Sequence, residues 1–258
     1  MSWLWKLAGI YLLYAGAMIL AHPRFIYPFG PDPFDARGFR QEVVSDRNVT
    51  LAISEQTGDT AVLYFMGNGG ALSYFAYSLI VHARAGRTVA AMEYPGGGGI
   101  PGTPSEDRLK ADALAAYDWL VQHHDGPIVV HGYSMGTGLA QHVAAERPVA
   151  AIILDAPFVK MCELMARASW LPACILPGIQ RWNSAALVPE LSAPVLIQHG
   201  GADELIPIGH GQRLAGLMHD AGLDVSFHAV PDATHVDLVG HPGYQTRIDE
   251  FLARVLAQ

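Results

Sequence analysis

The amino-acid sequence predicts an α/β fold in which a mostly parallel β-sheet is covered by helices on both faces. From about residue 39, short β-branched or apolar runs alternate with longer helix-like segments, which is the pattern of a buried parallel sheet. The chain has 258 residues, enough for one large domain with a substantial core. Hydrophobic residues make up 51% of it and charged residues only 16%, so the composition excludes intrinsic disorder.

The charge balance argues against a nucleic-acid partner, and the number and spacing of the cysteines argue against a metal site. Lys and Arg number 16 against 24 Asp and Glu, so the chain lacks the basic excess that nucleic-acid binding requires. Two cysteines, Cys162 and Cys174, are too few for a disulfide framework and lack the spacing of a metal site with histidine. We therefore expect no nucleic-acid partner and no metal.

The first element is an apolar segment at residues 3–21, whose one charge is Lys6. At roughly 1.5 Å per residue it is about 28 Å long, close to the ~30 Å hydrocarbon core of a bilayer. Its Trp and Tyr side chains are typical of a membrane interface, and Pro23 with Arg24 predict the end of the helix. We favour a signal anchor, residues 1–23, that makes the chain single-pass and holds the folded domain at the membrane surface. A cleaved signal peptide and an apolar helix packed on the domain or on a partner chain are the alternatives.

The remaining residues, 24–258, are expected to form the α/β domain. A Ser-Glu-Asp run at residues 105–107 has the form of a helix N-cap followed by acidic residues in the first turn. Strands are expected near residues 39–45, 49–54, 60–66, 88–93, 127–133, 149–155, 194–199 and 225–230. Helices are expected between them, near residues 72–85, 105–123, 135–146, 209–220 and 242–256.

One connection, residues 156–193, is too long for a simple link between two elements, and we interpret it as a small lid insertion. Met161, Leu164 and Met165 follow the i, i+3, i+4 spacing of a short amphipathic helix. Both cysteines lie in this segment. We favour two buried apolar thiols over a disulfide that braces the lid, because a disulfide would require an oxidising compartment.

A candidate nucleophile follows the strand predicted at residues 127–133. Gly132, Ser134 and Gly136 form a G-x-S-x-G motif that leads directly into a helix-like segment. The chemistry needs this spacing because the serine lies on a tight turn between strand and helix, where side chains at the two glycine positions would collide with backbone. The turn projects the hydroxyl above the sheet edge.

A serine hydroxyl is a weak nucleophile, so a histidine must take its proton and a carboxylate must orient that histidine. A useful histidine lies in a loop at the carboxyl end of a strand, the same edge as Ser134. His235 satisfies this condition, since it follows the last predicted strand and precedes the final helix. His241, at the start of that helix, is the second choice.

The candidate acid is Asp203, in the loop after the strand predicted at residues 194–199. Asp155, at the end of the preceding strand, competes for this role, and Glu204 is a weaker alternative. The chain order serine, aspartate, histidine is the order of one class of serine hydrolase.

Two backbone N–H groups are candidates for stabilising an oxyanion. One belongs to Met135, directly after the nucleophile, and the other to Asn68 in the glycine-rich loop at residues 66–70. Small residues in that loop allow the amides to face a substrate.

A second glycine motif, residues 97–102, matches G-x-G-x-x-G after a strand and formally suggests dinucleotide binding. Pro101 and Pro104 remove N–H donors where a pyrophosphate would need them, and no helix is expected to begin at the last glycine. We therefore reject a dinucleotide cofactor.

These motifs together resemble the α/β-hydrolase superfamily of serine hydrolases, and more narrowly its small, N-terminally anchored members. The resemblance runs from about residue 24 to the end. It rests on the three candidate catalytic residues and on Gly67-Asn68-Gly69, the stretch from Tyr94 to Glu106, and the stretch from Pro194 through Asp203 to Pro207.

The sequence departs from that family at two loops. The family commonly begins the oxyanion loop with His-Gly and the next loop with Tyr-Arg-Gly, whereas this chain has Met66-Gly67 and Tyr94-Pro95-Gly96. The first departure removes a side chain that usually braces the loop but leaves the backbone donors in place. The resemblance implies an α/β-hydrolase fold and cofactor-independent hydrolysis of carboxylic esters, sometimes thioesters or acylglycerols.

We expect a serine esterase that cleaves a small-molecule ester with an apolar or lipid-derived acyl group. Met161, Leu164, Met165 and Trp170 of the lid are the candidate substrate-binding residues, because they offer apolar surface beside Ser134. The alternatives are an acyltransferase or thioesterase that uses the same triad, and a non-catalytic binding module on the same fold.

Overall fold

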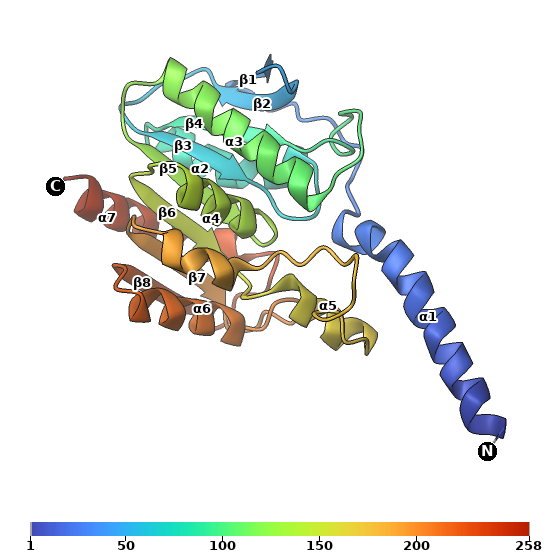
Figure 1. Ribbon diagram of the computed structural model, residues 1–258. Coiled ribbons are helices and arrows are strands. Elements are labelled where there is room, and N and C mark those ends of the chain that lie inside the picture. Colours follow the sequence, from blue (N-terminus) through green and yellow to red (C-terminus); the bar gives the residue numbers. More distant parts are fainter. Residues whose placement is uncertain (1, 258) are drawn as a thin grey trace.

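The computed structural model describes residues 2–257 and shows an eight-stranded sheet between two layers of helices (Figure 1). The strand order is β1-β2-β4-β3-β5-β6-β7-β8; β3 to β8 run parallel, β2 is antiparallel to β4, and β1 is antiparallel to β2. The predicted α/β class with a mostly parallel sheet is confirmed. The strands are β1 Phe39–Val44, β2 Val49–Ser54, β3 Ala61–Phe65, β4 Thr88–Glu93, β5 Ile128–Tyr133, β6 Ala151–Asp155, β7 Val195–Gly200 and β8 Val225–Val230.

Each strand in the middle of the sheet buries both of its faces. In β6, Ile152 and Leu154 join the core under one helical layer, whereas Ala151 and Ile153 join the core under the other. Figure 1 shows α3, α4 and α6 on the near face and α7 on the far face. The helices that cover the sheet are α2 Ala76–Arg84, α3 Glu106–His123, α4 Gly136–Glu146, α6 Gly209–Asp220 and α7 Tyr244–Leu256.

Apart from the amino-terminal helix, the observed helices and strands lie within two residues of the predicted ends, with one exception. The segment predicted as a helix at residues 72–85 begins with a 3-10 turn, η1 Leu72–Phe75, before α2 starts. The parallel register places Gly132 beside Phe65 and Tyr133 beside Asp155. The carboxyl ends of β3, β5 and β6 therefore meet at one edge, and the loops that leave these strands gather there.

The N-terminal helix α1, Ser2–Ile26, extends past the predicted end at Pro23. The expectation that Pro23 and Arg24 end the helix is therefore wrong. A proline inside a helix leaves the carbonyl four residues earlier without its N–H donor. Here that carbonyl, Ile19 O, is bonded by the Nδ1 of His22, and the N–H of Tyr27 donates to Pro23 O at 2.8 Å, so the last turn persists.

The amino-terminal part of helix α1 projects from the domain (Figure 1), whereas the helix contacts the lid and the domain from Tyr11 onward. Most of its large apolar side chains are exposed, including Trp5 at 75%, Leu13 at 77% and Leu20 at 85%. Among residues 2–257 it is the one helix long and apolar enough to cross a membrane. Five of the side chains that are at least half-buried share one face of the helix: Ala15, Met18, Ile19, His22 and Ile26.

The lid contains helix α5, Met161–Ser169, and the 3-10 helix η2, Ser184–Glu190. Cys162 and Cys174 form a disulfide with their Cα atoms 5.0 Å apart, so the expectation of two free thiols is wrong. Trp170 ends α5 with a left-handed φ of 59°, and this reversal turns the chain so that Cys174 returns to Cys162. The hydroxyl of Tyr14 donates to Ser169 O at 2.8 Å, so the lid also rests on α1.

Candidate active site

The candidate nucleophile lies on a strained turn between β5 and α4. Ser134 has φ of +52°, a left-handed conformation that non-glycine residues rarely adopt, and its N–H donates to Asp155 O at 2.8 Å. A Cβ at Gly132 would lie 2.4 Å from Gly136 O, and a Cβ at Gly136 would lie 2.1 Å from Phe65 O. Both flanking positions therefore require glycine, and the packed elements around them hold the serine in its strained conformation.

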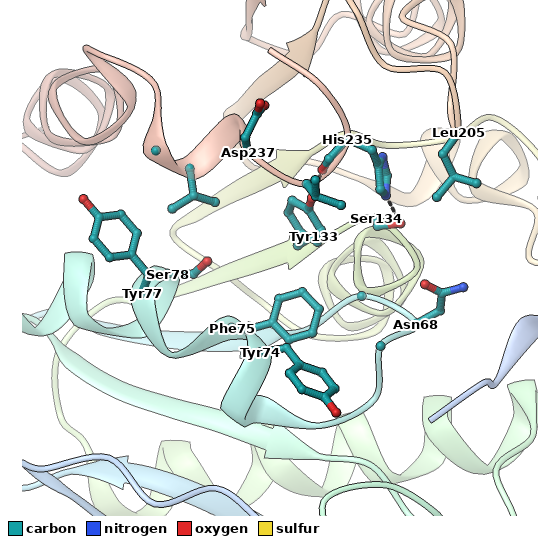
Figure 2. A pocket seen from close by; sticks show the side chains of 15 residues that line it. Asn68, Tyr74, Phe75, Tyr77, Ser78, Tyr133, Ser134, Leu205, His235 and Asp237 are labelled. Atoms are coloured by element: carbon teal, nitrogen blue, oxygen red, sulfur yellow. Dashed lines mark hydrogen bonds between the residues drawn. The ribbon is translucent and has the colours of Figure 1, made fainter. Parts of the chain in front are cut away.

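Ser134, His235 and Asp203 form one hydrogen-bonded chain. The Nε2 of His235 lies 2.9 Å from Ser134 Oγ (Figure 2). The Nδ1 of His235 lies 2.7 Å from Asp203 Oδ2. A carboxylate only accepts, so Nδ1 carries the proton and the lone pair of Nε2 faces the serine hydroxyl. All three side chains are largely buried. This is the geometry by which a histidine removes a proton from serine.

The carboxylate of Asp203 is oriented by its own loop. Its Oδ1 accepts the backbone N–H groups of Leu205 at 3.0 Å and Ile206 at 2.8 Å, which leaves Oδ2 for His235. Burial by itself raises the pKa of this carboxyl. Hydrogen bonds from His199 and His235 outweigh burial and hold the pKa of Asp203 well below its usual range, so the group is a carboxylate at neutral pH.

The alternative residues considered for the acid and the base have other partners. The carboxylate of Asp155 is engaged by His131 Nε2 at 2.8 Å and by the hydroxyl of Tyr244. Glu204 is exposed. His241 pairs with a neighbouring surface aspartate at 3.3 Å. The structure therefore brings together the three residues that the sequence favours and leaves the alternatives outside the chain of hydrogen bonds.

The two candidate oxyanion donors are Asn68 and Met135, which line a cavity together with Ser134. Within the described chain neither backbone N–H is engaged by an acceptor. Met135 immediately precedes α4, where the positive end of the helix dipole favours negative charge. Both groups are thus available to a charge that develops beside Ser134.

The oxyanion loop is braced by two residues that the sequence analysis missed. The hydroxyl of Tyr94 donates to Met66 O at 2.8 Å at the start of the loop, and the carboxylate of Glu93 accepts the N–H of Leu72 at 3.1 Å at its end. These contacts hold the loop at its start and just beyond its end. An acidic residue at the end of a buried strand was the available signal, since such a group needs a specific partner.

A further positioning residue lies inside the G-x-S-x-G motif. The hydroxyl of Tyr133 donates to the backbone carbonyl of His235. This contact links the loop after β8, which carries His235, to the strand that leads into Ser134. It therefore fixes the position of the base relative to the nucleophile.

Two cavities meet at the nucleophile. A cavity of about 540 Å³ extends past His235 and is lined by Tyr74, Phe75 and Tyr77 among others (Figure 2). A cavity of about 390 Å³ extends under the lid. Residues that line the second cavity include the predicted Met161, Leu164 and Met165, together with Phe25, Ile26, Arg167, Ala168, Glu204, Leu205 and Ile206.

Trp170, the fourth predicted substrate-binding residue, lines neither cavity. Its side chain is 88% exposed, because the left-handed turn at the end of α5 directs it away from the sheet edge. The prediction for Trp170 is therefore wrong.

Comparison with known proteins supports this reading of the fold. A family model described as alpha/beta hydrolase fold matches residues 60–173. An uncharacterised protein of Mycobacterium tuberculosis is 35% identical over 181 residues, which are 69% of this chain and 63% of that protein. The match thus spans less than two thirds of that relative.

Three further proteins that this chain resembles have names or descriptions, two of which refer to a lipase or an esterase. Protein bem46 of Schizosaccharomyces pombe is 27% identical over 83% of this chain and 74% of its own. The lysophosphatidylserine lipase ABHD12 of Danio rerio is 29% identical over 64% of this chain and 48% of its own. The esterase Pf2001 of Pyrococcus furiosus has the same fold, with a TM-score of 0.72 at 18% identity over 88% of this chain and 99% of its own.

The brace at Glu93 predicts a pH-dependent stability. Burial raises the pKa of Glu93 from 4.5 to about 7, although backbone N–H groups lower it in part. The pKa of Glu93 is thus higher in the folded chain than in the unfolded chain. Its contribution to the free energy of unfolding is therefore complete below about pH 4.5 and is lost as the pH rises through 7. Gln keeps an oxygen acceptor and cannot ionise. From pH 5 to 8 the free energy of unfolding of Glu93→Gln should rise relative to the native chain, by up to about 3 kcal/mol.

Urea unfolding at several pH values measures this difference. The control is Glu42→Gln, at a surface glutamate, which should follow the native chain at every pH. Parallel curves for Glu93→Gln and the native chain would show that Glu93 does not titrate in this range.

Proposed function

The chain is an alpha/beta hydrolase fold protein related to the bem46 and ABHD12 proteins, and we propose that it hydrolyses carboxylic esters through an acyl-enzyme on Ser134. The observation that carries this proposal is the chain of short contacts, 2.9 Å from Ser134 to His235 and 2.7 Å from His235 to Asp203. The relatives named as lipase and esterase agree with this chemistry.

In the proposed reaction each residue of the site has one defined role, which it repeats in acylation and deacylation. His235 takes the proton from Ser134 as Oγ attacks the ester carbonyl, and the N–H groups of Asn68 and Met135 stabilise the tetrahedral oxyanion. The intermediate collapses when the alcohol leaves with the proton from His235. Water then repeats the sequence on the acyl-enzyme, with His235 as base and Ser134 as leaving group. Asp203 keeps the imidazole in the required tautomer throughout.

The two cavities support an apolar acyl group and a more polar alcohol. The cavity under the lid has the flexible side chains of Met161 and Met165 beside Leu164, which suit an irregular apolar chain. The other cavity contains hydroxyl-bearing side chains and Asp237. A relative named as a lysophosphatidylserine lipase favours a lipid-derived ester as the substrate class.

We assign helix α1 the role of a membrane anchor. A helix that is apolar on all sides and mostly exposed requires an apolar environment around it. The Cys162–Cys174 disulfide persists in an oxidising compartment, so the lid and the domain that bears it are assigned to the non-cytoplasmic side.

Replacing the nucleophile should abolish both labelling and turnover. Only an activated serine reacts with a fluorophosphonate probe, so Ser134→Ala should lose probe labelling and ester hydrolysis together. Gel fluorescence and hydrolysis of p-nitrophenyl butanoate measure the two effects. Ser73→Ala, at a serine outside both cavities, is the control and should retain both. Full esterase activity in Ser134→Ala would contradict the mechanism.

The two buried aspartates should differ in their effect on kcat. Asp203→Asn fixes the wrong tautomer of His235 and should lower kcat by about three to four orders of magnitude. Asp155→Asn should leave most activity, because Asp155 contacts His131 and Tyr244 instead. Asp220→Asn, at an exposed aspartate at the end of α6 and outside both cavities, is the control. A larger loss in Asp155→Asn than in Asp203→Asn, with both variants folded by circular dichroism, would move the acid to Asp155.

Charges on the exposed faces of α1 should release the chain from membranes. Leu13→Asp with Leu20→Asp places two carboxylates where each costs about 2.5 to 3.5 kcal/mol at a bilayer centre. Flotation of the purified full chain with phosphatidylcholine vesicles should fall sharply. The control, Val121→Asp with Leu217→Asp, charges exposed positions on the domain and should float like the native chain. Undiminished flotation of the α1 variant would rule out this anchor.

A further inference from the structure

A third cavity, of about 240 Å³, lies between helix α1 and the lid, away from the catalytic residues. One wall is the half-buried face of α1, with Tyr14, Met18 and His22. The other wall is the lid, with Leu171 and Leu176 among its lining residues. We call this cavity the anchor groove.

The anchor groove adjoins the cavity under the lid. Phe25, Met165 and Ala168 line both, and the cavity under the lid also reaches Ser134. A continuous series of side chains thus runs from the middle of α1 to the nucleophile. From Phe25 back to Tyr14 the helix rises about 16 Å at 1.5 Å per residue, so the added length suits an extended chain rather than a small group.

Polar contacts hold the walls of the anchor groove at both ends. Tyr14 OH donates to Ser169 O at 2.8 Å, and the N–H of Gln180 donates to His22 Nε2 at 3.2 Å. Because His22 Nδ1 bonds to Ile19 O, both ring nitrogens of His22 have partners. Among the described lining residues none has an Asp, Glu, Lys or Arg side chain. The interior therefore presents apolar surface with its few polar groups already satisfied.

The surroundings of the anchor groove are also apolar. Leu20 and Phe25 of α1 are exposed, and so are Trp170 and Ile175 at the turn of the lid. With α1 in a bilayer, the groove opens beside the part of the helix that contacts hydrocarbon.

We propose that the anchor groove is an acyl-chain subsite, through which a lipid-derived ester passes from the bilayer to Ser134. This inference rests on the proposed function and adds the route and the length of the acyl chain. The chain lies between Met18 and Leu176, passes Met165, and places its carbonyl at Ser134. Helix α1 is then a wall of the binding site as well as an anchor.

Filling the anchor groove tests this proposal. Met18→Trp and Leu176→Trp each add bulk to one wall, and the control Leu13→Trp adds the same bulk to an exposed face of α1. The readout is the ratio of kcat/KM for p-nitrophenyl dodecanoate to kcat/KM for p-nitrophenyl butanoate. Both values are measured in micelles of the same detergent. Each buried methylene is worth about fourfold in kcat/KM. We expect the ratio to fall at least tenfold in both groove variants and to stay within twofold of the native value in Leu13→Trp.

The possible results distinguish failure of the acyl-chain subsite from failure of the proposed esterase function. A ratio that is unchanged in the groove variants, with butanoate still hydrolysed, would overturn the subsite and leave the proposed function standing. A native chain that hydrolyses neither ester and is not labelled at Ser134 would overturn the proposed function.

A second measurement does not depend on how the variants fold. A long-chain alkyl fluorophosphonate with a diazirine at its far end is attached to Ser134 of the native chain and then photolysed. Mass spectrometry should find the crosslink on Met18, Leu171 or Leu176. Crosslinks on Tyr74 or Tyr77 would place the chain in the other cavity and overturn the proposal.

Discussion

The strained turn at Ser134 is the constraint on which the rest of the site depends. Its positive φ of 52° aims Oγ at His235 and directs the following N–H, that of Met135, to the same space. Such strain costs about 1 to 3 kcal/mol and persists only where the surroundings over-determine it. Here they do so through the backbone contact to Asp155 and through two glycines that admit no side chain. The sheet, with helices packed on both faces, is the rigid body that maintains this turn.

Two buried aspartates at the carboxyl ends of the neighbouring strands β6 and β7 have different roles because their hydrogen-bond partners differ. Asp155, at the end of β6, is bound into a buried series in which His131 Nε2 lies 2.8 Å from its carboxylate and His82 Nε2 lies 2.8 Å from His131 Nδ1. Asp203, after β7, has Oδ1 fixed by backbone N–H groups, and its Oδ2 accepts from His235 at 2.7 Å. The first aspartate links the sheet to the helical layer on its far face, and the second serves the chemistry that we propose.

Local patterns predicted the fold and most of the site because their causes are local. Strand periodicity, the glycines around Ser134 and the loops after β7 and β8 all follow from neighbouring residues. The errors arose where a particular side-chain contact or turn decides the outcome, either within one helix or between distant segments. A histidine takes over the carbonyl that Pro23 leaves unbonded, a left-handed turn brings Cys174 to Cys162 and turns Trp170 outward, and Glu93 reaches forward from its strand to the loop at Leu72. None of these contacts has a signature in spacing or composition.

The central claim is that the acyl group is carried covalently by Ser134. Rapid acid quench during turnover of a p-nitrophenyl ester, followed by peptide mass spectrometry, tests it most directly. The account predicts an acyl adduct on the peptide that contains Ser134, formed in a burst that accompanies release of one equivalent of nitrophenol per chain. Turnover with the adduct on another residue, or turnover in which no acylated peptide forms under any quench condition, would contradict it.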